Sequence, residues 1–149
     1  MAFYYLETSA LVKLYVREPG TERLLRLADR SSANRLAILS LAQVEFRSAI
    51  RRRQKAGEIP TVIATQLLEA FRRHAEARFV TQKITDFLLD VASTLVDSHG
   101  LRAFDAIQLA GYMALRSSTV NDIPLFVCAD RDLLVAAERE GAPILDPCA

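Results

Sequence analysis

The chain alternates short, continuous apolar runs with longer stretches that have helical spacing. The clearest run is Leu125–Ala129, and similar runs occur at Phe3–Leu6 and Leu36–Leu39. Apolar runs of this length are typical of strands covered on both faces, as in parallel sheets flanked by helices. The pattern therefore predicts an α/β fold built on a parallel sheet.

The stretches between these runs carry signals for the starts and ends of helices. Gly57, Gly100 and Gly141 are placed as helix terminators, and Ser40 to Gln43 has the form of a capping box. The predicted helices cover residues 10–17, 21–29, 40–57, 60–77, 84–98, 103–116 and 130–140, and further strands cover 79–81 and 143–145. Because no repeat or linker interrupts this order, residues 1–149 are expected to form a single domain.

Composition excludes several classes of protein. The chain has 51% hydrophobic and 25% charged residues, as ordinary globular domains do, and its net charge of +1 identifies no partner. No apolar run approaches the roughly 18–20 residues of a membrane span, and no export signal is visible. Cys128 and Cys148 are too few for a disulfide framework or a zinc site. We expect a soluble protein without membrane contact in a reducing, cytoplasmic setting.

Four acidic residues stand where strands end or helices begin. Glu7 follows the first strand, Glu45 lies early in the third helix, Asp105 lies in a first turn, and Asp130 follows the clearest strand. Each has an ordinary explanation by itself: Glu45 could reach solvent or pair with an Arg, and the two Asp residues could cap helices or complement their dipoles. In a parallel sheet, however, all four positions are expected at one edge.

Several carboxylates at one edge would repel one another and raise their pKa values unless a cation neutralised them. No His or Cys accompanies them, so the all-oxygen set suits Mg²⁺ or Mn²⁺ better than zinc. Such a site is best suited to hydrolysis at phosphorus, where metals activate water and stabilise the attacking and leaving oxygens. The predicted catalytic and metal-binding residues are Glu7, Glu45, Asp105 and Asp130.

Four segments together resemble those of a known family. They are residues 5–12, 40–45, 101–110 and 127–134, and each contains one of the four acids. In this order and at these separations they resemble the PIN-domain ribonucleases, and most closely the VapC-type toxins of bacterial and archaeal toxin–antitoxin pairs. The resemblance covers essentially the whole chain.

The resemblance implies a three-layer, PIN-like fold with about five parallel strands between helices. It further implies metal-dependent endoribonuclease activity, a homodimer, and inhibition by a small cognate antitoxin. Glu7 takes the position of the family's first Asp, and Glu45, Asp105 and Asp130 match the other three acids. Thr8 and Ser9 match hydroxyl positions that would orient the first carboxylate, and Asp132 is a further candidate near the site.

The chain departs from the family pattern at two positions. Glu7 stands where Asp is usual, and its extra methylene lengthens the side chain by roughly 1.5 Å. Cys128 stands where Thr is frequent, and a thiol is a poorer hydrogen-bond donor than a hydroxyl. These departures leave open an alternative function: a catalytically weakened PIN-fold protein that binds RNA or antitoxin. A metal-dependent phosphatase of another α/β fold is a remote third possibility.

Basic residues offer candidates for RNA contact. Arg47, Arg51 and Lys55 recur every four residues as one helical stripe, with Arg52 and Arg53 beside it. Such a stripe could follow an RNA backbone or could simply be a solvated helix face. Arg102 could contact a phosphate or pair with an acid. Tyr15 and Tyr112 could stack on bases, although packing in the core is the simpler interpretation.

Overall fold

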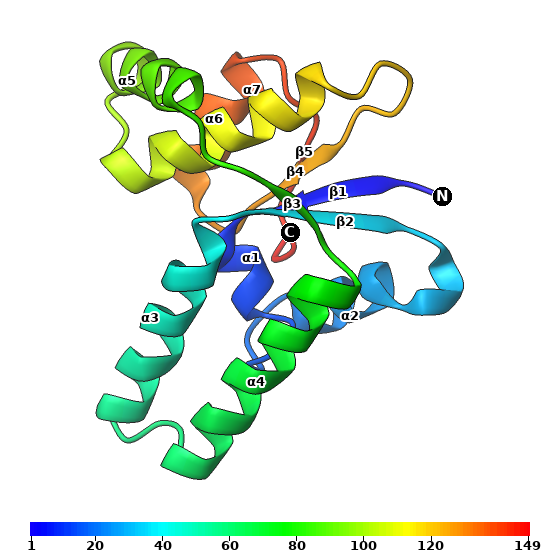
Figure 1. Ribbon diagram of the computed structural model, residues 1–149, viewed down its shortest axis with the longest axis vertical. Helices are drawn as coiled ribbons and strands as arrows, with labels where there is room; N and C mark the ends of the chain where they lie inside the picture. The colour runs from blue at the N-terminus through cyan, green and yellow to red at the C-terminus, as the bar shows by residue number, and fades with distance from the viewer.

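All the predicted strand runs form strands of one parallel sheet. The computed structural model describes residues 1–149 and places the strands in the order β3-β2-β1-β4-β5, every neighbouring pair being parallel (Figure 1). The strands are β1 (Phe3–Leu6), β2 (Arg35–Leu39), β3 (Val80–Gln82), β4 (Leu125–Val127) and β5 (Ile144–Leu145). The predicted α/β fold with five parallel strands is confirmed.

Seven α-helices connect or flank the strands. They are α1 (Thr8–Val12), α2 (Thr21–Ala28), α3 (Ala42–Lys55), α4 (Thr61–Ala77), α5 (Asp86–His99), α6 (Ala103–Ser117) and α7 (Arg131–Arg139), with a short 3-10 helix at Arg30–Ser32. None of these helices combines the length and the apolar character that crossing a membrane requires.

The starts of two helices differ from the sequence prediction. The first helix begins at Thr8 rather than Ala10, because the Glu7 side chain caps it, and it ends at Val12 rather than near Arg17. The predicted capping box is wrong: Leu41 stands at the N-cap of α3 in a helical conformation, and no side chain caps the helix. The chain already turns before α3 begins, so Ser40 contributes its backbone carbonyl to the amide of Gln43 instead.

The helices form two layers, one on each face of the sheet. Alternate strand residues point to opposite faces, so Phe3 and Tyr5 pack against α5, α6 and α7, while Leu6, Ile38 and Val127 pack against α1 to α4. Figure 1 shows α3 and α4 on one side of the sheet and α5, α6 and α7 on the other. Both faces of the central strands are therefore buried.

The strand order places the carboxyl ends of β1, β2 and β4 next to one another. From β1 the chain adds β2 and β3 on one side, and it later adds β4 and β5 on the other. The sheet therefore has a topological switch point beside β1, where open α/β sheets bind their ligands. Glu7 directly follows β1, α3 follows β2, and Asp130 follows β4.

Candidate active site

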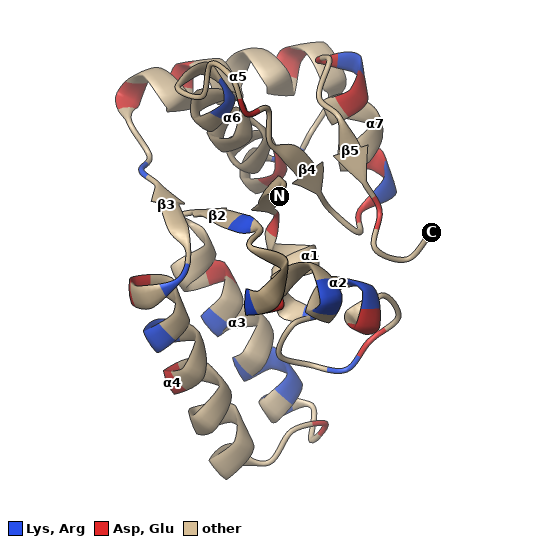
Figure 2. Ribbon diagram, turned by 90° about the vertical axis from the view of Figure 1, so that its right-hand side faces the viewer, with Lys and Arg blue, Asp and Glu red and all other residues tan.

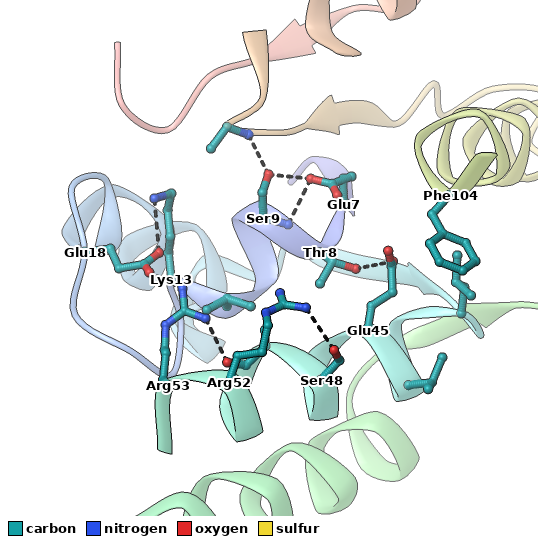
Figure 3. A pocket seen from close by; sticks show the side chains of 15 residues that line it. Glu7, Thr8, Ser9, Lys13, Glu18, Glu45, Ser48, Arg52, Arg53 and Phe104 are labelled. Carbon is teal, nitrogen blue, oxygen red and sulfur yellow. Dashed lines mark hydrogen bonds and ion pairs between the residues drawn. The ribbon is translucent and has the colours of Figure 1, made fainter. Parts of the chain in front are cut away.

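A cleft with a volume of about 500 Å³ lies at this switch point (Figure 3). Glu7 and Glu45 both line it, although they lie on different elements. Its walls come from the start of α1, the length of α3 and the first turn of α6. The other lining residues are Thr8, Ser9, Val12, Lys13, Glu18, Leu41, Val44, Ser48, Ala49, Arg52, Arg53, Phe104 and Ala129.

Glu7 is nearly buried and is fixed by Ser9. One carboxylate oxygen, Oε2, accepts hydrogen bonds from the backbone amide of Ser9, at 2.9 Å, and from its hydroxyl. The Ser9 hydroxyl in turn accepts the amide of Ala129, at 2.9 Å, which ties Glu7 to the chain that follows β4. Burial raises the pKa of Glu7 from its ordinary 4.5 to about 6, although the bonds from Ser9 oppose this shift.

Glu45 is oriented by two donors from other elements. The Thr8 hydroxyl and the Gln108 amide nitrogen both donate to Oε1 of Glu45, each at 2.7 Å. Gln108 also donates to the Thr8 hydroxyl, at 3.1 Å. Three elements, α1, α3 and α6, therefore meet at one carboxylate oxygen, and the role expected for Thr8 is exercised on Glu45 rather than on Glu7.

Gln108 links this carboxylate to the core. Its side chain is fully buried, and its amide oxygen lies 2.9 Å from the Tyr5 hydroxyl, which is equally close to the Gln108 backbone carbonyl. Since a carboxylate only accepts hydrogen bonds, the amide nitrogen has to face Glu45. Gly111 makes room for this contact, because a Cβ there would lie 2.8 Å from the Tyr5 hydroxyl and 2.7 Å from Leu39 Cδ1.

Asp105 and Asp130 are more open. Asp105 lies in the first turn of α6 and is half-buried, whereas the exposed Asp130 caps α7 by accepting the amide of Leu133 at 3.2 Å. Burial raises the pKa of Asp105, the charges of Asp130 and Glu45 raise it further, and Arg102 opposes them. The structure thus brings Asp105 within electrostatic range of two other predicted site acids.

Cys128 lies behind the acids rather than among them. Its buried sulfur accepts the Asp130 amide at 3.2 Å and lies 3.7 Å from the Ser9 hydroxyl. Burial and the charge of Glu7 raise the pKa of the thiol well above its usual value. The thiol therefore stays protonated and supports the turn that carries Asp130.

The donor set fits a hard divalent cation, since it consists of carboxylates that form no ion pair with a basic side chain. None of the four predicted acids takes part in any of the ion pairs of the structure. At the same time, no three acidic, His or Cys side chains are already gathered closely enough to hold a metal ion. Glu7 and Glu45 face the cleft, while Asp105 and Asp130 are not part of its lining.

Comparison with models of protein families identifies the family to which the chain belongs. The family model of the PIN domain matches residues 4–139, which includes all four acids. The chain belongs to the PIN domain family. The resemblance drawn from the sequence motifs is therefore confirmed. PIN domains are generally nucleases.

Solved structures share the PIN fold at low sequence identity. PAE2754 from Pyrobaculum aerophilum matches with a TM-score of 0.66 at 22% identity, covering 96% of this chain and 83% of that one. A chain of a toxin–antitoxin complex from Klebsiella pneumoniae gives 0.61 at 17% identity, with 97% of both chains covered. VapBC2 from Rickettsia felis, bound to a promoter DNA fragment, gives 0.63 at 14% identity, covering 97% of this chain and 98% of that one. No curated protein matches by sequence.

Several predicted residues of this PIN domain lie away from the cleft. Asp132 is exposed and lines a separate hollow with His99 and Arg139. Arg47 and Arg51 line a hollow between α3 and α4 that also contains Arg72. None of these three residues lines the cleft of Glu7 and Glu45. The supporting role of Asp132 stays a prediction, as does contact with RNA for Arg47, Arg51, Lys55 and Arg102.

The cleft contains basic residues that the sequence analysis did not assign to it. Lys13 is buried and pairs with Glu18 at 3.3 Å, and Arg53 pairs with the same carboxylate at 2.6 Å. Arg52 donates to the Ser48 hydroxyl at 2.9 Å. The spacing of Arg52, seven residues after Glu45, was a usable signal, because seven residues make almost two helical turns.

The tyrosines considered for base stacking belong to the core. Tyr112 is fully buried and donates to the carbonyl of Pro124 at 2.7 Å. Tyr15 packs edge-on against Phe46 and Phe71, and its hydroxyl lies 2.7 Å from His74 Nδ1. The structure supports the packing interpretation for both.

Proposed function

We propose that this PIN domain is a metal-dependent endoribonuclease that hydrolyses RNA phosphodiester bonds and acts as the toxin of a toxin–antitoxin pair. The observation that carries the proposal is the position of Glu7 and Glu45 in one cleft at the switch point of the sheet. Both carboxylates are oriented by hydroxyl or amide donors, and neither has a cationic partner.

Mg²⁺ or Mn²⁺ is the proposed cofactor, with Glu7, Glu45, Asp105 and Asp130 as the residues that would hold it. When bound, such an ion would supply charge neutralisation at the phosphodiester and a water molecule of lowered pKa. Ser9 and Thr8 fix the two cleft carboxylates before substrate arrives. Burial and the charges of Asp130 and Glu45 raise the pKa of Asp105, which suits it to accept a proton from the attacking water.

The proposed partners are an RNA substrate, a small cognate antitoxin and a second copy of the chain, in the cytoplasm. The support for an antitoxin is that the fold recurs in toxin–antitoxin complexes, from Klebsiella pneumoniae and Rickettsia felis among others. The homodimer rests on the family resemblance alone, and the cytoplasmic location rests on the reducing setting that the composition of the chain predicts.

Cleavage of RNA by the purified chain tests the activity. We expect cleavage in Mn²⁺ or Mg²⁺, its loss in EDTA, and its loss in Asp105→Asn, which keeps the shape of the side chain and removes its charge. Asp97→Asn is the matched control, since Asp97 is exposed on α5 and is not part of the cleft lining. An Asp105→Asn protein that cuts as well as the parent would show that the site is wrongly assigned.

A second candidate function is a catalytically weakened PIN protein that retains RNA or antitoxin binding. The observation that favours it is that one oxygen of Glu7 accepts the Ser9 amide and caps α1. Only the other oxygen is then free to bind a metal ion. A displacement of about 1 Å can cost on the order of 10²-fold in rate. Glu7→Asp discriminates the two: a large gain in metal-dependent cleavage would mean that the chain is impaired, and unchanged cleavage that Glu7 suffices.

A further inference from the structure

Besides its acidic and basic parts, the cleft has an exposed apolar surface. Phe104 and Val44, from α6 and α3, both line it and are 61% and 60% exposed. Each is the immediate sequence neighbour of a predicted catalytic acid, Asp105 or Glu45. Figure 3 shows the Phe104 ring projecting from α6 on the same side of the cleft as Glu45. Single exposed apolar residues are ordinary, but two that meet at an acidic cleft need an explanation.

The basic end of the cleft has one guanidinium without a carboxylate partner. Lys13 and Arg53 are both neutralised by Glu18, whereas Arg52 bonds only to the Ser48 hydroxyl. Val44, Ser48 and Arg52 recur every four residues and all line the cleft, so one stripe of α3 runs from the apolar part to Arg52. Figure 2 shows further basic residues along α3.

We infer that this stripe and Phe104 form a subsite for one unstacked nucleotide of single-stranded RNA. The base stacks on the Phe104 ring with its edge against Val44, and a phosphate on the far side of the acids binds Arg52. The inference rests on the proposed function in one respect: the phosphodiester that is cut lies at Glu7 and Glu45, between the base contact and the phosphate contact.

The chemistry of the surface favours this occupant. An aromatic face beside a guanidinium matches the alternation of flat base and charged phosphate in a single strand, and base stacking is tolerant of sequence. The bases of a duplex are already stacked on one another, so an exposed ring can take up only an unpaired one. Arg52, rather than Arg51, is assigned because Arg51 lines the other side of α3.

Binding of a fluorescent oligoribonucleotide tests the base contact. We would use Ca²⁺ in place of Mg²⁺ or Mn²⁺, with electrophoresis to confirm that the RNA stays intact. Phe104→Ala should raise Kd by about 5- to 100-fold, which corresponds to the loss of one stacked base. Phe104→Tyr should retain binding. Phe87→Ala is the matched control, because Phe87 is 76% exposed on α5 and does not line the cleft.

An oligoribonucleotide with an abasic position separates stacking from general damage. When the abasic site replaces the base that stacks on Phe104, it should weaken binding to the parent chain. It should not weaken binding to Phe104→Ala, since that variant has no ring on which a base can stack. Equal weakening of both proteins would overturn the stacking contact. A change of oligomeric state in Phe104→Ala, with RNA affinity unchanged, would identify the patch as a protein contact instead and would also overturn it.

The salt dependence of binding tests the phosphate contact. Each phosphate neutralised in a single strand contributes about 0.7 to the slope of log K against log salt. Arg52→Gln should reduce the slope by about that amount, whereas Arg26→Gln, an exposed change on α2 outside the cleft lining, should leave it unchanged. An unchanged slope in Arg52→Gln would overturn the assignment of Arg52. Because these measurements need no cleavage, a chain that binds in this way but never cuts RNA would contradict the proposed function and leave the subsite intact.

Discussion

The two halves of the candidate active site are built differently. On the side of α1 and α3, Glu7 and Glu45 are tied by bonds from Ser9, Thr8 and Gln108, and Glu7 is only 6% exposed. On the side of α6 and α7, Asp105 is half-buried and Asp130 is exposed. Of these two, only Asp130 forms a side-chain bond, to the amide of Leu133.

This difference separates two tasks of an acidic site: holding charge in a fixed position and adjusting to the ligand that enters. The α1 and α3 side is fixed before any ligand binds, because Glu45 is linked through Gln108 to the buried Tyr5 and Glu7 is held by Ser9. The α6 and α7 side is free to adjust, because Asp105 makes no side-chain hydrogen bond and Asp130 is exposed. A rigid pair beside an adjustable pair suits a site in which substrate and cation enter together, since the rigid pair supplies the preorganised charge.

Removing the link between core and carboxylate is the strongest test of this contrast. In Gln108→Met, Glu45 loses its amide donor, and we expect activity to fall by about 10- to 100-fold. The free energy of unfolding should fall by about 1–3 kcal/mol, because buried polar groups lose a partner. Cleavage assays and urea unfolding measure the two effects. Gln66→Met, an exposed change on α4, is the control; wild-type activity in Gln108→Met would mean that the rigid side is not needed.

The buried charge of Glu7 should make the metal-free fold less stable as the pH rises. Its pKa is about 6 in the folded protein against an ordinary 4.5, so between these values the folded state binds more protons. Stability is therefore lost as the pH rises through that window. Glu7→Gln should remove roughly 2 kcal/mol of this loss. Urea unfolding in chelator at pH 4.5 and pH 7 compares the proteins, and identical pH dependence would contradict the buried charge.

The smallest effect on stability is expected on the α6 and α7 side. Asp130→Asn should abolish cleavage but change the free energy of unfolding by no more than about 0.5 kcal/mol, because Asn caps a helix as well as Asp does. Thermal unfolding of the metal-free protein measures this. A loss above about 1 kcal/mol would show that Asp130 is as much a part of the fold as Glu45, and the contrast between the two sides would disappear.

Local sequence signals were sufficient for the strands and for the four acids. Buried parallel strands need continuous apolar runs, and ligands of such sheets collect at their carboxyl ends, so Glu7 and Asp130 could be recognised by position alone. Glu45 and Asp105 were predicted from their places near the starts of helices, and the resemblance to PIN domains, which the family comparison confirms, agreed with that prediction. Local signals failed at the start of α3, where a backbone turn replaces the predicted capping box.

The remaining features depended on contacts between residues far apart in the chain. Gln108 reads as one polar residue in the apolar stretch 106–110, yet it bonds to Thr8 and Glu45, which are 100 and 63 positions away. Similarly, the sequence offered one basic stripe, with Arg52 and Arg53 beside it. Only the packing of α3 against α1 and α4 decided that Arg52 faces the cleft.

The sequence by itself thus determined the parallel sheet and the edge at which Glu7 and Glu45 line one cleft, since the carboxyl ends of parallel strands lie at one edge. Tertiary structure alone decided which carboxylates are rigid and which side chains surround them. The physical reason is that hydrogen bonding and burial of a side chain depend on neighbours from other elements, whereas strand and helix formation depend mainly on the local order of residues.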